Sequence, residues 1–336
     1  MSSSPVATSK NPVLGYAALF IAIGLLPMLG VYPIFVMKVL CYALFACAFN
    51  LLIGFTGLLS FGHAAFLGTA AYAAGHAMKV WGMPTPVGLL LGTLAAAGVG
   101  LLFGLLAIKR TGIYFSMITL ALSQMLYFFF LQAPFTGGED GLQSVPRGSF
   151  FGIDLASDIT LFYVVLAIFI AGFWLIYRTV HSPFGQVLTS IRENEPRAIS
   201  LGYDTDRFKL LAFVLSAGLA GLAGATKTLV LGFATLTDAV WTTSGLVILM
   251  TLVGGMGTLV GPMVGALVII SLENKIGDLG KALADITGID WFNGLGESVS
   301  LVTGLIFIIC VLAFRRGLVG EALALWDRLR AKKTSS

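Results

Sequence analysis

The sequence predicts an all-α integral membrane protein with about ten transmembrane helices and both termini in the cytoplasm. Three observations support this prediction. Of the 336 residues, 57% are hydrophobic and only 11% are charged, whereas a soluble domain carries roughly 25% charged residues. The mean hydropathy is +0.95, and the 41 glycines are spread through apolar runs. A water-soluble fold could not cover this much apolar surface with so few charges.

Apolar runs follow one another along the chain, and a helical span needs about 20 residues. We expect spans at 13–31, 35–53, 60–79, 86–108, 112–132, 159–177, 209–232, 241–255, 258–273 and 298–314. The eighth and ninth of these are short. The first run is expected to be a retained span, because no clear A-x-A cleavage site follows it. A single transmembrane domain over 13–317 is therefore predicted, with a polar N-terminus (1–12) and a basic C-terminal tail (318–336).

The distribution of charge predicts the orientation of the chain. Lys and Arg mark the cytoplasmic side of a membrane protein, and most of them fall in or beside one set of segments, among them the loop 179–208. The loops predicted on the outer side, 133–158 and 274–297, contain three basic and eight acidic residues. This asymmetry places both termini inside.

Residues that carry enzyme or cofactor chemistry are sparse. Cys41, Cys47 and Cys310 lie inside apolar runs without the spacing of a metal site or a disulfide framework, so we interpret them as packing residues. No GxxxxGK[ST] motif and no Ser/His/Asp, paired-carboxylate or Cys/His constellation occurs. The chain is therefore not expected to be an enzyme or to bind a metal or cofactor. Its net charge of +4 requires no nucleic-acid partner.

Ionisable side chains within the predicted spans are few, chiefly His63, His76 and Lys227, and no Asp or Glu lies in the middle of a span. Proton-coupled carriers commonly use such carboxylates as relays, so their absence disfavours a carrier of that kind. We expect the Lys227 ammonium to reach the outer interface; attraction of an anionic substrate group is the alternative. His63 is expected to be a hydrogen-bonded residue at a helix start.

Two glycine-rich segments interrupt the helical pattern, Gly54–His63 and Gly254–Gly257. Each is expected to follow a span that runs inward and to precede one that runs outward. Interrupted segments in matching positions of two halves point to a transport path, because broken backbone at membrane depth survives only where protein or water satisfies its polar groups. Ordinary tight turns at the inner surface are the alternative. The candidate substrate-path residues, together with Lys227, are Ser60, Gly62, His63, Gly254, Gly255 and Gly257.

A tandem GxxxG series comprises Gly257, Gly261 and Gly265. Residues four apart share one face of a helix. The predicted ninth span therefore presents a glycine groove against which a second helix backbone can pack closely, and we assign these three glycines to helix packing.

The loop between the sixth and seventh predicted spans favours a short amphipathic hairpin on the cytoplasmic face. Ser182 followed by Pro183 marks a helix start, and apolar residues follow at helical spacing up to Ile191. Pro196 is expected to end or kink this helix, and Gly202 to close a second short turn. The charges of the hairpin have both signs, which suits a protein partner better than a lipid surface; a solvated loop is the alternative.

Three stretches in this order, Gly57–Gly68, Ser190–Ala225 and Gly254–Pro262, resemble the permease of the branched-chain amino acid ABC importers, of the LivM type. The resemblance covers most of the chain. It implies a multi-pass subunit of the bacterial inner membrane that pairs with a second homologous permease, two ATPase subunits and a periplasmic substrate-binding protein. ATP and Mg would be bound by the ATPases, and the loop between spans six and seven seats in a groove of an ATPase in such importers.

The resemblance also suggests which residues couple permease and ATPase. Glu195, Ala198 and Gly202 resemble the EAA-type coupling signature, although the spacing differs and Pro196 and Arg197 replace small residues. The full set of candidate coupling residues is Arg192, Glu193, Glu195, Arg197, Ala198 and Gly202.

The predicted function is therefore that of the permease subunit of an ATP-driven importer, which moves branched-chain or other hydrophobic amino acids by alternating access. Urea or another small polar solute is the alternative substrate, because urea permeases resemble the same family. A secondary carrier or channel that works without ATPases is an alternative of another class, as is a membrane scaffold or ligand sensor.

Overall fold

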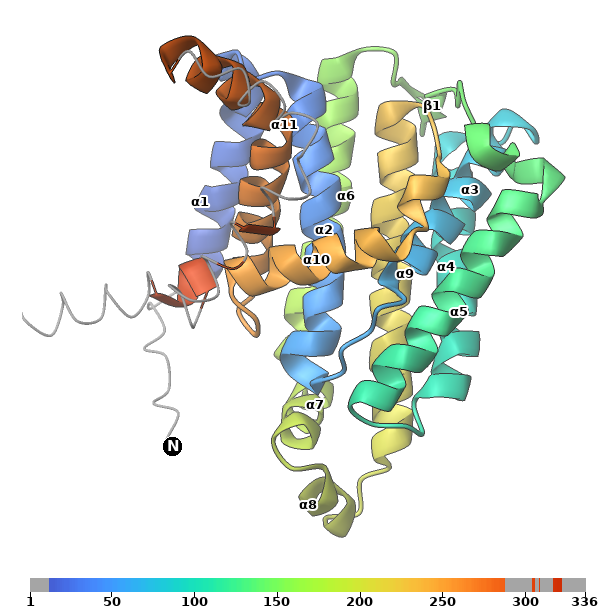
Figure 1. The fold of residues 1–336 in the computed structure, drawn as a ribbon, viewed down its shortest axis with the longest axis vertical. Helices are drawn as coiled ribbons and strands as arrows, with labels where there is room; N and C mark the ends of the chain where they lie inside the picture. The colour runs from blue at the N-terminus through green and yellow to red at the C-terminus, as the bar shows by residue number, and fades with distance from the viewer. Residues whose placement is uncertain (1–11, 288–303, 306–307, 309–316, 322–336) are drawn as a thin grey trace, which may run out of the picture.

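The computed structural model describes residues 12–287, 304–305, 308 and 317–321, and this part of the chain is mostly helical (Figure 1). Five of its helices are long and apolar enough to cross a membrane. They are α2 (Pro33–Thr56), α4 (Thr85–Ala107), α5 (Ile113–Gln132), α6 (Asp158–Val180) and α9 (Thr205–Leu231).

Further helices complete the bundle. Helix α1 (Pro12–Leu25) continues into the 3-10 turn η1 (Leu26–Leu29), α3 covers His63–Lys79, and α10 covers Trp241–Gly254. Helix α11 (Gly261–Thr287) packs against α10 and α2.

The prediction of an outer loop at 274–297 is wrong over 274–287, where α11 continues as a helix. Apolar residues there still recur at helical spacing after the apolar span has ended, so the helix extends although its composition becomes polar. The predicted tenth span at 298–314, the N-terminus 1–12 and the tail 318–336 lie wholly or mostly outside the described residues.

The connection between α5 and α6 contains two 3-10 turns, η2 (Pro134–Thr136) and η3 (Gly138–Asp140), and a hairpin of two-residue strands, β1 (Ser149–Phe150) and β2 (Ile153–Asp154). It lies at the opposite end of the bundle from the short helices α7 (Pro183–Glu193) and α8 (Glu195–Ser200) (Figure 1). Following the charge asymmetry of the sequence, we call the end with α7 and α8 the inner end and the opposite end the outer end.

Helix α3 begins above the inner end of α2. The segment 57–62 rises from the end of α2, and α3 starts at about the level of α10 (Figure 1). The Ala64 amide in its first turn donates to Ser244 Oγ of α10 at 2.9 Å. The first glycine-rich segment is therefore an irregular stretch of backbone packed inside the bundle rather than a tight turn at its surface.

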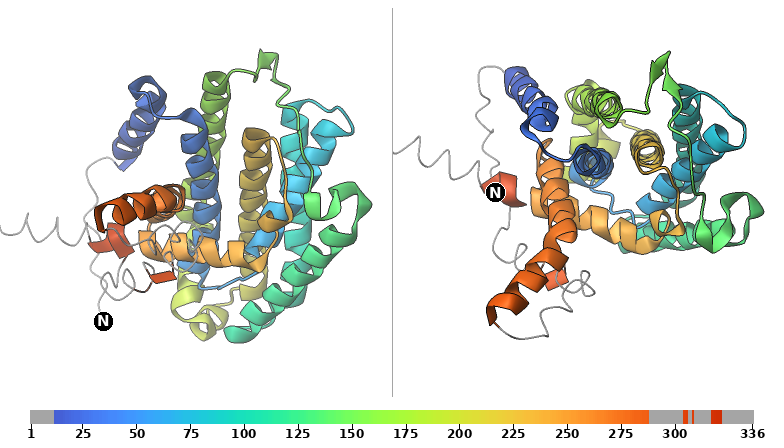
Figure 2. Two further views of the ribbon diagram at one scale, coloured as in Figure 1. Left: turned by 45° about the horizontal axis from the view of Figure 1, so that its top comes forward. Right: turned by 90° about the horizontal axis from the view of Figure 1, so that it is seen from above.

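Helix α10 lies across the bundle, nearly perpendicular to α2 and α9, in all three views (Figures 1 and 2). The prediction of a span at 241–255 that runs inward is therefore wrong. At 1.5 Å per residue, its 14 residues cover only about 21 Å of the roughly 30 Å of hydrocarbon. The sequence pattern of a short apolar helix is the same for both orientations, so the direction of α10 is set by its packing on α2 and α11.

Helix α4 packs closely against α9 and α3. Small residues recur at every fourth position along α4 and are all buried: Gly88, Gly92, Ala96, Gly100 and Gly104. A Cβ atom on Gly100 would collide with Ala217 Cβ of α9, and one on Gly221 would collide with Ala96 Cβ. This small-residue stripe lets the helix backbones approach closely, which favours helix association in lipid.

The stripe leads to a prediction about stability. Gly100→Leu inserts a side chain where no space exists, and we expect it to lower the free energy of unfolding by about 1–3 kcal/mol. Gly98 lies on the same helix, is exposed, and a Cβ there meets nothing within 4 Å, so Gly98→Leu is the matched control. Thermal unfolding of the detergent-solubilised variants measures the difference. Equal midpoints for the two variants would contradict the close packing of α4 on α9.

Candidate functional site

The hairpin at the inner end is built by local hydrogen bonds. It consists of α7 (Pro183–Glu193) and α8 (Glu195–Ser200). Ser182 Oγ accepts a hydrogen bond from the Gly185 amide at 3.4 Å, and Asn194 Oδ1 accepts one from the Arg197 amide at 3.1 Å. Both helices therefore begin at a capped residue, and Gly202 follows α8 in a left-handed turn with φ 88°.

The apolar side of α7 holds the hairpin against the inner ends of the long helices. Leu188 and Ile191 are buried, and α7 packs on α2. The rings of Phe184 and Phe208 stack with their centroids 5.6 Å apart, which joins the start of α7 to α9. Motion of the hairpin must therefore displace the inner end of α2 or α9.

Arg192 connects the hairpin to both glycine-rich segments. Its Nη1 donates a hydrogen bond to the Gly54 carbonyl oxygen in the last turn of α2. A Cβ atom on Gly57 would lie 3.0 Å from Arg192 Cγ, and one on Gly257 would lie 3.5 Å from Arg192 Nη1. Gly57 and Gly257 both have φ 75°, a conformation that glycine adopts without strain. One side chain of the predicted coupling set thus touches both breaks.

Asn50, one helical turn before Gly54, links the second break to α2. Its Nδ2 donates to the Thr258 carbonyl oxygen at 2.8 Å, and its Oδ1 accepts from the Gly257 amide at 3.0 Å. The side chain is 2% exposed. Sequence reasoning did not select Asn50, although a lone amide within an apolar span is a readable signal for hydrogen bonding between helices.

The second break is a tight turn between α10 and α11. Gly254 lies against the backbone of Gly261 and Gly265, and Gly265 also lies against the Met250 carbonyl oxygen. Gly257, however, precedes α11 and is not helical. The prediction that Gly257, Gly261 and Gly265 share one helix face is therefore wrong for Gly257, because the turn needs its positive φ. Gly255 has φ 117° in the same turn.

The first break is fastened to α5. Ser60 is fully buried and its Oγ accepts from the Gly62 amide at 3.2 Å. The Phe61 amide donates to Thr119 Oγ1 at 3.2 Å, and Ser116 Oγ donates to the Leu59 carbonyl oxygen at 2.6 Å. Hydroxyl groups of α5 thus satisfy backbone groups that no helix pairs, as membrane depth requires.

His63 is the first residue of α3 and is buried among the rings of Phe49, Phe66 and Phe213. Its Nε2 lies 2.8 Å from Ser216 Oγ, and this hydroxyl donates to the Ala48 carbonyl oxygen at 2.6 Å. Because the hydroxyl proton is used there, His63 Nε2 donates to Ser216. The structure thus gives His63 a hydrogen bond at a helix start, and its role in a substrate path stays a prediction.

The other candidate coupling residues differ in their surroundings. Glu193 and Arg197 are exposed at the inner surface, whereas Ala198 is buried. The Glu195 carboxylate forms an ion pair with Lys209 and accepts from Thr205 Oγ1 at 3.3 Å. It therefore faces α9 rather than a partner, and the docking of this surface to an ATPase stays a prediction.

The prediction that Lys227 reaches the outer interface is wrong. Its ammonium is buried and forms an ion pair with Asp238 in the 3-10 turn η4 (Leu236–Asp238). The chain folds back beside α9 after residue 231, so that a carboxylate lies closer to the ammonium than the interface does. Asp238 follows Lys227 by eleven positions, and this spacing does not correspond to any helix or strand periodicity from which the pairing could be predicted.

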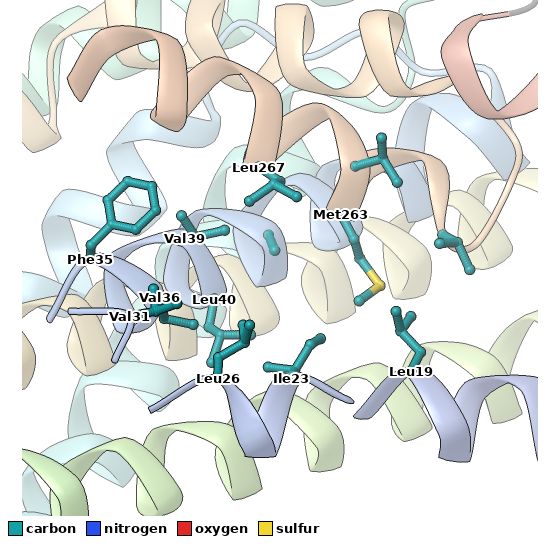
Figure 3. Close-up of a pocket in the computed structure, with 13 residues that line it drawn as sticks. Leu19, Ile23, Leu26, Val31, Phe35, Val36, Val39, Leu40, Met263 and Leu267 are labelled. Atoms are coloured by element: carbon teal, nitrogen blue, oxygen red, sulfur yellow. The ribbon is translucent and has the colours of Figure 1, made fainter. Parts of the chain in front are cut away.

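An apolar groove of about 350 Å³ lies between α1, α2 and α11. All 13 side chains that line it are apolar, and those of α11, such as Met263 and Leu267, face those of α1 and α2 (Figure 3). A polar solute would find no hydrogen-bond partner there. The groove suits hydrocarbon chains of lipid, and we assign it no part in the path.

Long spans, broken helices with satisfied backbone and an inner hairpin together define a membrane permease. Residues 33–314 match the family described as branched-chain amino acid transport system / permease component. The chain belongs to this family. No solved structure matches the chain.

Curated relatives include the LivM permease proteins of the high-affinity branched-chain amino acid transport systems of Escherichia coli K12, 25% identical, and Salmonella typhimurium LT2, 26% identical. Each alignment covers 264 residues, 71% of this chain and 62% of the relative. The chain thus spans less than two thirds of the length of these relatives. The ribose import permease RbsC of Bacillus subtilis is 30% identical over 190 residues, 54% of this chain and 51% of that protein.

The bridge at Asn50 yields a second prediction. Asn50→Leu removes the partners of the Gly257 amide and the Thr258 carbonyl oxygen, and we expect it to destabilise the fold by about 1–3 kcal/mol for each buried group left unpaired. Asn274 on α11 is exposed, so Asn274→Leu is the control for loss of an asparagine. Thermal unfolding compares the two variants. An unfolding midpoint for Asn50→Leu equal to that of the control would show that these hydrogen bonds do not hold the second break to α2.

Proposed function

We propose that this chain is the transmembrane permease subunit of an ATP-driven importer of the bacterial inner membrane. The observation that carries the proposal is the contact of Arg192, on the inner hairpin, with Gly54, Gly57 and the turn at Gly257. A push on the hairpin from below is transmitted by this contact to both breaks of the membrane helices.

The proposed assembly contains a second homologous permease, two ATPase subunits and a periplasmic substrate-binding protein. ATP hydrolysis, with its Mg, belongs to the ATPases. Their closure draws the hairpins together, and the exposed Glu193 and Arg197 provide the surface they grip. The permease pair then shifts between outward-open and inward-open states, because each state makes different contacts with the ATPases.

Branched-chain or other hydrophobic amino acids are the proposed substrate, by analogy with the LivM relatives. Sugar import is the second candidate, favoured by the partial matches to a ribose import permease and to the autoinducer 2 import permease LsrC of Klebsiella pneumoniae, 31% identical over 156 residues. The binding protein that delivers the solute would decide between them.

The coupling contact yields a third prediction. Arg192→Met removes the hydrogen bond to Gly54 but keeps much of the stem over Gly57. A hydrogen bond from a charged group contributes about 1.5–3 kcal/mol, and 1.4 kcal/mol corresponds to about a tenfold change. We therefore expect the rate of ATP-dependent substrate uptake to fall roughly tenfold or more. Uptake and ATPase activity would be measured in proteoliposomes that contain the permease with candidate ATPase subunits, a second permease and a substrate-binding protein.

Arg207→Met is the matched control, since Arg207 also lies at the inner end but pairs only with the exposed Asp204, at 2.8 Å. The control should keep uptake near the level of the unaltered protein, and both variants should still bind the ATPases. Full uptake with Arg192→Met would remove the coupling role. Uptake by the permease alone, driven by an ion gradient, would favour a secondary carrier instead.

A further inference from the structure

Lys227 and Asp238 form an ion pair enclosed by the bundle, towards the outer end of α9. Their side chains are 7% and 3% exposed, respectively. Lys227 Nζ also lies 5.8 Å from the centroid of the Tyr42 ring of α2. Charges at such depth are costly and commonly mark a path for a solute or ion, yet nothing in the coupling mechanism uses this pair.

Polar atoms around the pair lack partners. Among the residues that the structure describes, Asp238 Oδ2, Tyr72 Oη and Thr228 Oγ1 are buried and make no hydrogen bond. Lys227 uses one of its three N–H donors, on Asp238 Oδ1. Buried polar groups in native proteins are nearly always paired. The unpaired oxygen of the ion pair and the two unpaired hydroxyls of α3 and α9 therefore indicate that a polar guest belongs there.

The helix packing brings these residues together. Gly68, Tyr72 and Gly75 share one face of α3, at positions i, i+4 and i+7. A Cβ on Gly68 would collide with Ala239, the neighbour of Asp238, and one on Gly75 would lie 3.4 Å from Thr228 Cγ2. Tyr72 thus stands between the Asp238 segment and Thr228 on this face of α3.

We propose that Lys227, Asp238, Tyr72 and Thr228 bind the charged backbone of a zwitterionic α-amino acid. The ligand carboxylate would accept hydrogen bonds from Lys227 and the two hydroxyls, and the ligand ammonium would donate to Asp238 Oδ2. In the empty site Lys227 and Asp238 neutralise each other. In the occupied site each one faces the opposite charge of the ligand, so that no charge is left unpaired in either state.

This inference rests on the proposed import function and narrows it. A sugar or urea carries no pair of opposite charges and would leave Lys227 and Asp238 joined to each other, gaining only the hydroxyl contacts. An α-amino acid matches both charges at once. The site therefore discriminates by the two charges of the ligand backbone.

The test uses the full-length chain in lipid nanodiscs and radiolabelled L-leucine as the probe. L-leucinol, which lacks the carboxylate, 4-methylpentanoate, which lacks the ammonium, and D-ribose serve as competitors. For the unaltered protein we expect L-leucine to compete at least roughly tenfold better than the first two, and D-ribose not to compete. Removal of one partner from a buried charge pair should weaken L-leucine binding roughly 30-fold or more in Lys227→Met and Asp238→Asn.

The variants also have distinct signatures. Lys227→Met should bind L-leucine and L-leucinol equally, and Asp238→Asn should bind L-leucine and 4-methylpentanoate equally. Tyr72→Phe leaves all charges in place and should bind L-leucine several-fold more weakly, which tests the site even if the charge variants do not fold. Arg147→Met, which breaks the partly exposed Arg147–Asp158 pair (2.6 Å), should behave as the unaltered protein.

Any of three results would overturn the proposed site. They are unaltered selectivity in folded Lys227→Met, full L-leucine affinity in Tyr72→Phe, and no L-leucine binding to the unaltered chain at millimolar concentration. These outcomes are separate from the coupling test. A chain that drives ATP-dependent uptake but fails here keeps its proposed function and loses this site. A chain that binds L-leucine but never stimulates an ATPase keeps the site and loses the coupling.

Discussion

One constraint governs this structure: backbone that leaves the helix inside a membrane must have its amides and carbonyl oxygens paired by protein. The segment 57–62 and the turn 255–260 are two such places. Their partners are side chains from other elements, namely Ser116 and Thr119 of α5 for the first segment and Asn50 of α2 for the second. Each break therefore depends on at least one neighbouring helix for its hydrogen bonds.

The same dependence explains how the inner hairpin can act on the bundle. Arg192 donates to the Gly54 carbonyl oxygen, and Asn50 lies one helical turn before Gly54. Arg192 lies against Gly57 and Gly257, and Asn50 accepts a hydrogen bond from the Gly257 amide. If α7 moves, the Gly54 carbonyl oxygen must find another partner or move with it. A displacement of α7 would therefore break this hydrogen bond at the inner end of α2 or carry the end of α2 with it.

Hydropathy and glycine content predicted the membrane class and the two breaks, and a helix-start signal with apolar residues at helical spacing predicted the hairpin, because these features are local in the sequence. The direction of α10, the non-helical state of Gly257 and the partner of Lys227 were missed, since each is decided by packing between distant segments. The stripe on α4 is different. Its spacing is the same GxxxG signal that selected Gly261 and Gly265, so this packing face was predictable from the sequence although it was not predicted.

Glycine has two opposite uses in this chain: close packing of regular helices and formation of turns between them. On α4 and α9, buried glycines in regular helix bring backbones into contact, and a packed core of this kind resists deformation. At Gly57, Gly255 and Gly257, glycines with positive φ form turns that can adopt other conformations at little cost. The block of α3, α4 and α9 is therefore suited to remain fixed, and the proposed coupling would displace α7, α10 and α11 about these turns. Lys227 and Asp238 lie between the two, because Asp238 stands on the segment that joins α9 to α10.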